Sequence, residues 1–295
     1  MRHVWWRWWL LGLSVCFCAQ ALAAITVTDD AGRHVSLAAP ARRIVSLSPH
    51  ITDMLLLLGA RAQLVGVVDD HESPGSYAQS LTGLPVVAGP GSVNEERLLA
   101  VRPDLVLVWQ SGLDKARAQR LEAMGLTVVY IEPATLEGIP GNIEMLGQLT
   151  GHADMAQRAA QSLREQLAGL RQHYAAGRRL KAFYEVWQQP LYTLQGRHLV
   201  SQALALCGAD NIMPVGTVAA PMVNVEYVLR ADPDVIFFGA AGAAASQTFW
   251  GRFPGLKAVR QGHLVALPTN ALGRPGPELI QALPGLCEQL APWRR

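Results

Sequence analysis

Short apolar runs alternate with longer amphipathic stretches along most of the chain. The runs are rich in β-branched residues, and the stretches between them carry apolar residues at helical spacing. Such continuously apolar runs indicate strands covered on both faces, which is typical of parallel sheets flanked by helices. We therefore predict strands at residues 43–47, 64–68, 105–109, 128–131, 182–187, 235–238 and 264–267.

The same unit occurs twice in the sequence. Residues 93–108 and 223–238 are identical at six positions with a constant offset of 130. Both contain a helix-capping Asn, a Glu two residues later, a helix, a Pro-Asp turn and an apolar strand. Each half also begins with a strand, a polar turn and a helix that ends in Leu-Gly-Ala (58–60) or Cys-Gly-Ala (207–209). The repeat predicts two Rossmann-like α/β lobes with mostly parallel sheets.

A long helix is predicted between the repeats. Ala and Leu recur at helical spacing among Arg, Gln and Glu, and Gly151 marks a point where the helix could break. We therefore divide the chain into an N-terminal α/β lobe (24–141), one long linking helix (142–177) and a C-terminal α/β lobe (178–295). Because ligands of parallel sheets bind beyond the carboxyl ends of the strands, we expect a ligand cleft between the lobes.

Residues 1–23 have the pattern of a secretory signal peptide. The basic residues Arg2 and Arg7 precede an apolar run, and small residues follow it, which predicts cleavage after Ala23 or Ala24. An uncleaved membrane anchor is the alternative, but the apolar run is too short to span a bilayer. A lipoprotein that begins at one of the two cysteines of this segment would need a smaller residue before that cysteine. We expect export to the periplasm.

Removal of this segment changes the charge and the cysteine content. The loss of Arg2 and Arg7 cancels the formal net charge of +2, and a neutral chain argues against nucleic acid as a partner. Cys207 and Cys287 are then the only cysteines, and in an oxidising compartment one pair most simply forms one disulfide. A metal-binding or nucleophilic role is the alternative, but there is no Cys-x-x-Cys and no adjacent Cys/His pair.

With these features the chain resembles the single-helix-hinged periplasmic binding proteins, which serve ABC importers of cobalamin, haem and ferric siderophores. The resemblance covers residues 25–290 and is strongest to the cobalamin-binding members. It implies a monomeric binding protein, not an enzyme, with no cofactor, a corrinoid such as cobalamin as its ligand and an inner-membrane ABC permease dimer as its partner. It is carried by residues 43–53, 58–60, 94–97, 102–106, 121–125, 196–212, 232–234 and 274–277, and by Cys207 and Cys287.

The predicted strand ends supply candidate ligand contacts. A corrin is a broad, partly apolar disc with amide arms, which suits aromatic platforms and a few hydrogen-bond donors rather than a charge clamp. Trp109 aligns with an aromatic residue that contacts ligand in the cobalamin-binding relative, whereas Pro90 and Pro221 stand where that relative has tryptophans. We predict ligand binding by Ser48, Pro49, His50, His71, Pro90, Trp109, Trp187, Pro221, Asn270 and Arg274.

Several of these residues have structural alternatives. Trp109 and Trp187 could close the core at the lobe boundary. His50 is better explained as a turn or capping residue than as a metal ligand, and we predict no metal site. Arg274 could pair with Glu278 one helical turn later or point into the cleft.

Haem, ferric-siderophore and enzyme functions stay open as alternatives. Haem requires an axial Tyr or His, for which His50, His71 and Tyr192 are available. Anionic siderophores require converging cations, and only Arg274 is well placed. A cleft hydrolase could use Ser48 with His50, but the chain has no Gly-x-Ser-x-Gly, no His-Glu-x-x-His and no phosphate loop.

The repeat also places one carboxylate at matching positions in both lobes. Glu96 and Glu226 each stand two residues after a capping Asn, where the helix dipole itself favours a negative charge. In the family, the glutamate at this position in each lobe docks onto arginines of the twofold-symmetric permease. The resemblance therefore predicts that Glu96 and Glu226 are docking residues.

Overall fold

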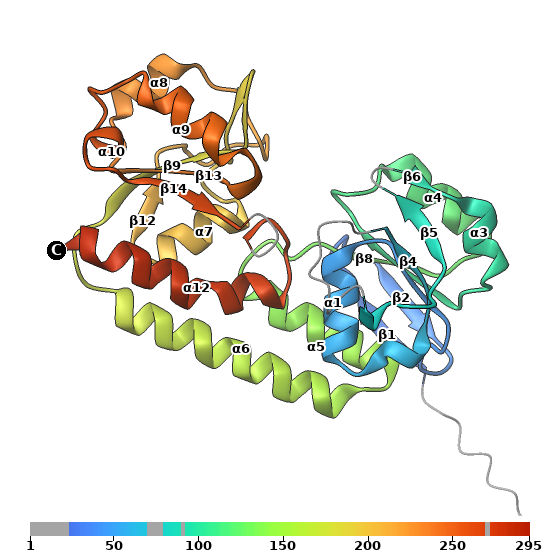
Figure 1. The fold of residues 1–295 in the computed structure, drawn as a ribbon. Helices are drawn as coiled ribbons and strands as arrows, with labels where there is room; N and C mark the ends of the chain where they lie inside the picture. The colour runs from blue at the N-terminus through green and yellow to red at the C-terminus, as the bar shows by residue number, and fades with distance from the viewer. Residues whose placement is uncertain (1–23, 70–78, 90–91, 269–271) are drawn as a thin grey trace, which may run out of the picture.

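The computed structural model describes residues 24–69, 79–89, 92–268 and 272–295. It has two α/β lobes, joined along one side by long helices (Figure 1). The predicted signal peptide and three of the predicted ligand residues, His71, Pro90 and Asn270, lie outside the described residues.

The N-terminal lobe contains a six-stranded sheet with the order β6-β5-β4-β3-β7-β8, in which only the short edge strand β6 is antiparallel among the described strands. Alternate residues of its strands belong to two separate core clusters: Leu105 and Leu107 lie in one, and Val106 and Val108 in the other. Both faces of the sheet are therefore buried, which explains the continuous apolar runs. The elements are β1 (Ile25–Thr28), β2 (His34–Leu37), β3 (Ile44–Ser46), α1 (Pro49–Leu57), η1 (Ala60–Gln63), β4 (Leu64–Val68), β5 (Val86–Gly89), β6 (Ser92–Val93), α3 (Glu95–Ala100), β7 (Leu105–Trp109), α4 (Lys115–Ala123) and β8 (Val128–Ile131).

The C-terminal lobe contains a parallel four-stranded sheet with the order β12-β9-β13-β14. A short antiparallel hairpin, β10 with β11, follows β9. The strand predicted at 182–187 ends at Glu185, so Trp187 does not end a sheet strand but begins this hairpin. The elements are β9 (Leu180–Glu185), β10 (Trp187–Gln188), β11 (Leu191–Tyr192), α7 (Leu199–Leu206), β12 (Ala209–Asn211), α8 (Val225–Ala231), β13 (Val235–Gly239), η2 (Ala240–Gly242), α9 (Ala243–Gly251), α10 (Lys257–Arg260), β14 (Leu264–Leu267), α12 (Pro277–Leu290) and η3 (Ala291–Arg294).

The two lobes repeat the same structural unit, as the sequence predicts. Strands β7 and β13 occupy positions exactly one repeat offset apart, and each lies between two parallel neighbours. The side chains of Asn94 and Asn224 accept a hydrogen bond from the third residue of the following helix, at 2.9 Å in both lobes. After that helix Arg102 and Asp232 both have positive φ, +43° and +46°. Equivalent residues of the two lobes therefore have the same role: the Asn caps the helix, and the residue with positive φ follows its end.

Two helices, not one, connect the lobes. Helix α5 (Gly138–Thr150) ends at Gly151, whose φ of +77° is the left-handed conformation typical of a glycine helix end. Helix α6 (Ala153–Tyr174) has 22 residues, which corresponds to about 33 Å, and lies beneath both lobes in Figure 1. The predicted break at Gly151 is confirmed, while the helical region begins four residues earlier than predicted and ends at Tyr174.

A disulfide joins two helices within the C-terminal lobe, and a buried arginine holds this lobe to the end of α6. Cys207 and Cys287 form the predicted disulfide, which joins the end of α7 to α12. The Arg294 guanidinium donates to the carbonyl oxygens of Tyr174 and Ala176, at 3.0 and 2.6 Å, where α6 ends. Gly208 leaves room for that guanidinium, since a Cβ there would lie 2.2 Å from it. Over the described part of the chain, no helix is long and apolar enough to cross a membrane.

Candidate ligand-binding site

A hollow of about 220 Å³ lies at the carboxyl ends of the N-lobe strands. Its walls come from the segments that follow β3, β4, β5 and β7, which is where ligands of parallel sheets bind. Three of the predicted ligand residues take part in it. We call this the N-lobe hollow; it is lined by Leu47, Ser48, Pro49, Val68, Asp69, Ala88, Gly89, Ser92, Val93, Trp109, Gly112 and Leu113.

Ser48, Pro49 and His50 form the turn from β3 into α1. Ser48 is the N-cap residue, and its carbonyl oxygen accepts the first helical bond from the amide of Thr52 at 3.1 Å. Pro49 occupies the first helical position, where its missing N–H costs nothing. The Ser48 Oγ bonds not to the helix backbone but to Nδ1 of His50 at 2.8 Å. This bond fixes the imidazole beside the hollow.

His50 is buried and uncharged. Burial, together with a smaller effect from the positive charge of Arg274, lowers the pKa of His50 from 6.5 to about 3. The side chain is 2% exposed, and its Nε2 has no hydrogen-bond partner among the described residues. His50 is thus the second residue of a helix and bonded to its cap, as the structural alternative for it predicts.

Arg274 and His50 are far apart in the sequence but lie close enough for the charge of Arg274 to lower the pKa of His50. Arg274 precedes α12, which is packed with the C-terminal lobe, whereas His50 is the second residue of α1 in the N-terminal lobe. Gly276 lies between them, since a Cβ at Gly276 would be 3.2 Å from that of His50. Arg274 therefore stands at the junction of the lobes, and its pairing with Glu278 stays a prediction.

Trp109 ends β7 and belongs to the core and to the N-lobe hollow at once. Its ring packs against the main apolar cluster and makes an edge-on contact with the His50 ring, with centroids 5.4 Å apart. Gly112 accommodates the indole, because a Cβ there would lie 2.4 Å from the ring. The buried indole Nε1 has no hydrogen-bond partner within the described residues. This buried donor is thus unsatisfied within the described residues.

A second hollow, of about 530 Å³, lies at the carboxyl ends of β9 and β13 in the C-terminal lobe. It is the counterpart of the first. The offset of 130 makes Trp109 equivalent to Gly239 and Leu107 equivalent to Phe237. Because Leu107 and Phe237 pair with Ser46 and Tyr184, the residues that follow these, Leu47 and Glu185, also correspond. We call this the C-lobe hollow; it is lined by Glu185, Val186, Trp187, Gln188, Gln189, Gly239, Ala241, Gly242, Ala245 and Ser246.

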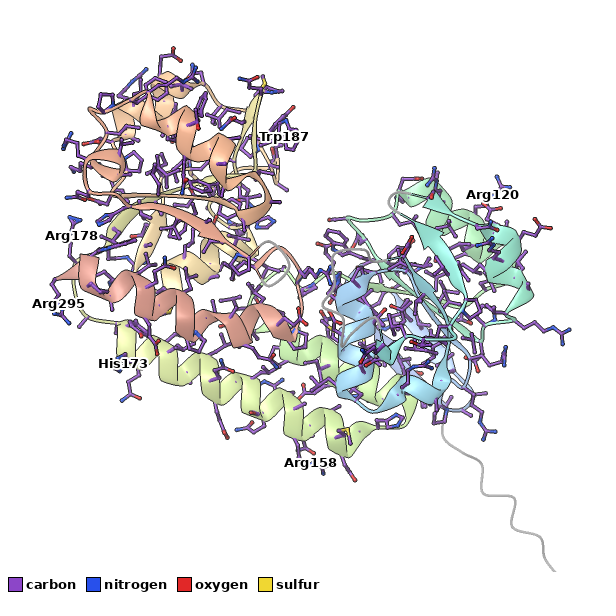
Figure 2. The ribbon with its side chains drawn as sticks, viewed as in Figure 1. Arg120, Arg158, His173, Arg178, Trp187 and Arg295 are labelled. Carbon is purple, nitrogen blue, oxygen red and sulfur yellow. A yellow bond between two sulfur atoms is a disulfide. The ribbon has the colours of Figure 1, made fainter. Side chains whose placement is uncertain are left out.

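Three large side chains form a row beside the C-lobe hollow. Trp187 is the cross-strand partner of Tyr192 in the hairpin, and Tyr192 also forms an antiparallel bridge with Met222. Directly opposed residues share one face of a sheet, so the three side chains lie on the same side. Trp187 and Met222 are each 65% exposed, and in Figure 2 Trp187 is on the side of its lobe that faces the other lobe. We call Trp187, Tyr192 and Met222 the apolar platform.

The platform was only partly visible in the sequence. Trp187 was predicted as a ligand contact, whereas Met222 and Tyr192 could be placed beside it only through strand register. Pro221 contributes its carbonyl oxygen, which accepts a hydrogen bond from the amide of Thr193 at 3.1 Å and holds residues 221–223 against the hairpin. The sequence signal for the hairpin was the turn pair Gln189 and Pro190, which stands between two short apolar pairs.

Glu96 and Glu226 are both exposed, at the second position of α3 and of α8. The neighbouring Glu95 has no acidic counterpart in the other lobe, where Val225 stands at its position. Its carboxylate pairs with Arg120 of α4 at 2.9 Å. Figure 2 labels Arg120 on the outer edge of the N-terminal lobe. Within the described ranges, no cluster of three or more His, Cys, Asp or Glu side chains could hold a metal ion.

Comparison with known proteins agrees with this architecture. The vitamin B12-binding protein of Pectobacterium atrosepticum is 32% identical over 290 residues, which are 96% of this chain and 94% of the relative. The crystal structure of the periplasmic vitamin B12 binding protein BtuF of Vibrio cholerae has a TM-score of 0.77 and 31% identity, over 85% of this chain and 97% of that one. The periplasmic heme-binding protein BhuT, at 20% identity, shares the fold with a TM-score of 0.74 over 85% of this chain and 98% of its own. The periplasmic binding protein family matches residues 44–271, and the chain belongs to that family.

Proposed function

We propose that this protein binds a corrinoid, cobalamin or a close relative, in the periplasm and delivers it to an ABC importer. The observation that carries the proposal is similarity over nearly the whole chain to vitamin B12-binding proteins, at about 30% identity in sequence and with the same fold. Export through a cleavable segment at residues 1–23 is part of the proposal.

The chemistry of the two hollows suits a corrin. The exposed side chains of Trp187 and Met222 in the apolar platform offer a flat surface to a broad ring, while Gln188 and Gln189, which line the C-lobe hollow, can hydrogen-bond to amide arms. Neither hollow has a Lys or Arg among the described residues that line it. Anionic iron complexes are bound by converging cations, so the described lining favours a ligand without a large negative charge.

Haem is the second candidate, because a haem-binding protein shares the fold. Haem needs an accessible His or Tyr as axial ligand. His50 is buried and bonded to Ser48, which leaves Tyr192, half-buried in the apolar platform, as the described candidate. A Tyr192→Phe variant that loses hemin binding but keeps cyanocobalamin binding would identify haem as an alternative ligand at the same platform.

A hydrolase is disfavoured by the state of His50. A Ser-His pair requires an imidazole that can accept the serine proton near neutral pH. A His50 pKa of about 3 makes this imidazole a weak base, and its Nδ1, which bonds to Ser48, belongs to a buried ring. The pair therefore acts as a structural contact at the start of α1.

For the partner, we infer that Glu96 and Glu226 contact the permease. Both carboxylates are exposed, and the matching caps of Asn94 and Asn224 hold the two helix starts in the same local geometry. Two similar lobes would present this pair of acids to a twofold-symmetric dimer of basic pockets. Exposed charges of this kind act mainly on association rate and on its salt dependence. A monomeric binding protein fits this arrangement.

The ligand is identified by the visible absorption spectrum of purified protein that has been incubated with cyanocobalamin, hemin or ferric citrate and then desalted. The proposal predicts that only the corrin spectrum is retained at about one equivalent. Retention of hemin without cyanocobalamin would replace the corrinoid by haem. The recovered corrinoid should be chemically unchanged, because a binding protein releases what it binds.

A further inference from the structure

Glu185 is a buried carboxylate in the C-terminal lobe. It is the last residue of β9 and is 5% exposed. Its two oxygens accept hydrogen bonds from the Ser246 hydroxyl, at 2.6 Å, and from the Trp250 indole N–H. Both donors are neutral, and no Lys or Arg of the described residues forms an ion pair with it. Both oxygens of the Glu185 carboxylate therefore act only as hydrogen-bond acceptors.

The fold itself does not require an acid at this position. In the N-terminal lobe the equivalent residue is Leu47, which also lines a hollow at the end of the central strand. A buried charge without an opposite charge is costly compared with an apolar residue of similar size. Glu185 is therefore a difference between the two lobes. Because a buried charge at this position lowers stability, we attribute it to ligand binding.

Glu185 borders the C-lobe hollow together with Trp187 and Gln188. Since low-dielectric walls focus an electric field into a concave site, the charge acts on whatever occupies the hollow more strongly than a surface charge would. Asp69 is the acid among the described residues that line the N-lobe hollow. No cation among the described residues lines the C-lobe hollow.

We infer that Glu185 is a specificity-determining residue, whose buried negative charge makes the C-lobe hollow prefer cationic over anionic ligands. The inference rests on the proposed function, because it names the charge class that the site accepts. A corrinoid that carries a positive charge at its metal centre gains from this field, a neutral corrinoid is unaffected, and anionic iron complexes are repelled.

The test compares wild-type protein with Glu185→Gln, which keeps the shape and both hydrogen bonds: the amide oxygen accepts from Trp250, and the amide NH₂ donates to the Ser246 hydroxyl. Affinities for neutral cyanocobalamin and cationic aquocobalamin are measured by titration at pH 6. Coulomb's law for a charge about 10 Å away in an effective dielectric constant of about 20 gives about a tenfold effect. We expect the aquocobalamin preference to fall about tenfold in Glu185→Gln, with cyanocobalamin affinity unchanged within about twofold.

The control is Asp210→Asn, which removes an exposed charge from the same lobe, where Asp210 pairs with Arg179 at 2.5 Å outside the hollow. The ligand preference of this variant should equal that of wild type. The visible spectrum of bound aquocobalamin must match that of the free cation, which shows that its water has not been displaced by a histidine.

Three outcomes would overturn the inference. The first is an unchanged preference in Glu185→Gln, and the second is an equal loss for both corrinoids together with a lower melting temperature, which would make Glu185 a structural tie between β9 and α9. If wild type binds neither corrinoid, the proposed function fails first. The inference then predicts that Glu185→Gln binds hemin or ferric citrate more tightly than wild type, and a weaker, equal or absent affinity is the third overturning outcome.

Discussion

At the scale of single residues, Trp109 carries the sharpest prediction about the ligand. Its ring borders the N-lobe hollow while packing on the core. Trp109→Ala should weaken corrinoid binding by about 1–3 kcal/mol, the range for a lost aromatic contact. Isothermal titration measures this loss, and thermal unfolding of the free protein measures the separate cost to the core. Normal affinity in the folded fraction of the variant would assign Trp109 to the core alone.

His50 predicts a pH dependence of stability. Its folded-state pKa of about 3 lies below the unfolded value of 6.5, so the unfolded chain binds more protons between these values. Stability is therefore complete above pH 6.5 and is lost as the pH falls toward 3, by up to about 3 kcal/mol between pH 6.5 and 4. His50→Gln should remove this part of the loss. Urea unfolding at several pH values checks it, and equal slopes for variant and wild type would contradict it.

At the scale of elements, the repeat provides a matched pair of strained positions. Arg102 and Asp232 both have positive φ after their helices, where a side chain costs about 1 kcal/mol or more and glycine costs less. Arg102→Gly should therefore stabilise the protein by about 0.5–1 kcal/mol. Asp232→Gly should not, because its carboxylate accepts a hydrogen bond from the Lys257 amide at 2.9 Å. Chemical denaturation measures both, and equal changes would show that backbone strain does not decide the difference.

Elements with continuous apolar runs were predictable from the sequence. Strands β4, β7, β8 and β14 have the predicted bounds, because each is a continuous run of apolar residues, and β7 and β8 are buried along almost their whole length. The hairpins β1–β2 and β10–β11 were not predicted, since their strands have only two to four residues and are partly exposed. Such short strands form because they pair with a neighbouring strand, and which strands pair cannot be read from a single sequence.

The candidate site was predictable only where single strands end. Trp109 and Ser48 follow directly from strand ends in a parallel sheet. The row of Trp187, Tyr192 and Met222 depends on hairpin register, and the closeness of Arg274 to His50 depends on how the C-terminal segment returns to the other lobe. Both depend on tertiary contacts, which the spacing of apolar residues along the chain does not reveal.

At the scale of the whole molecule, the arrangement of the lobes relates the two hollows to Glu96 and Glu226, the proposed docking residues. Helix α6 lies beneath both lobes, and Arg294 holds the C-terminal lobe to the end of this helix. We expect such a base to restrain the relative motion of the lobes. A ligand held between them would therefore reach the permease in one orientation, set by the positions of Glu96 and Glu226.

The double variant Glu96→Ala with Glu226→Ala tests this arrangement. Both side chains are exposed, so corrinoid affinity should stay within about threefold, or ~0.7 kcal/mol, while corrinoid uptake by cells should be abolished. Glu144→Ala with Glu165→Ala removes two carboxylates from α5 and α6 and should leave uptake normal. Normal uptake by the first variant, or loss of its ligand affinity, would show that these glutamates are helix caps or cleft residues.

The central claim is that the protein binds a corrinoid without changing it, and isothermal titration with cyanocobalamin tests this most directly. The account predicts one site per chain and recovery of the intact corrinoid after the protein is unfolded. Hemin measured in parallel should compete weakly or not at all. Absence of heat with cyanocobalamin, combined with tight binding of hemin at one site, would contradict the claim.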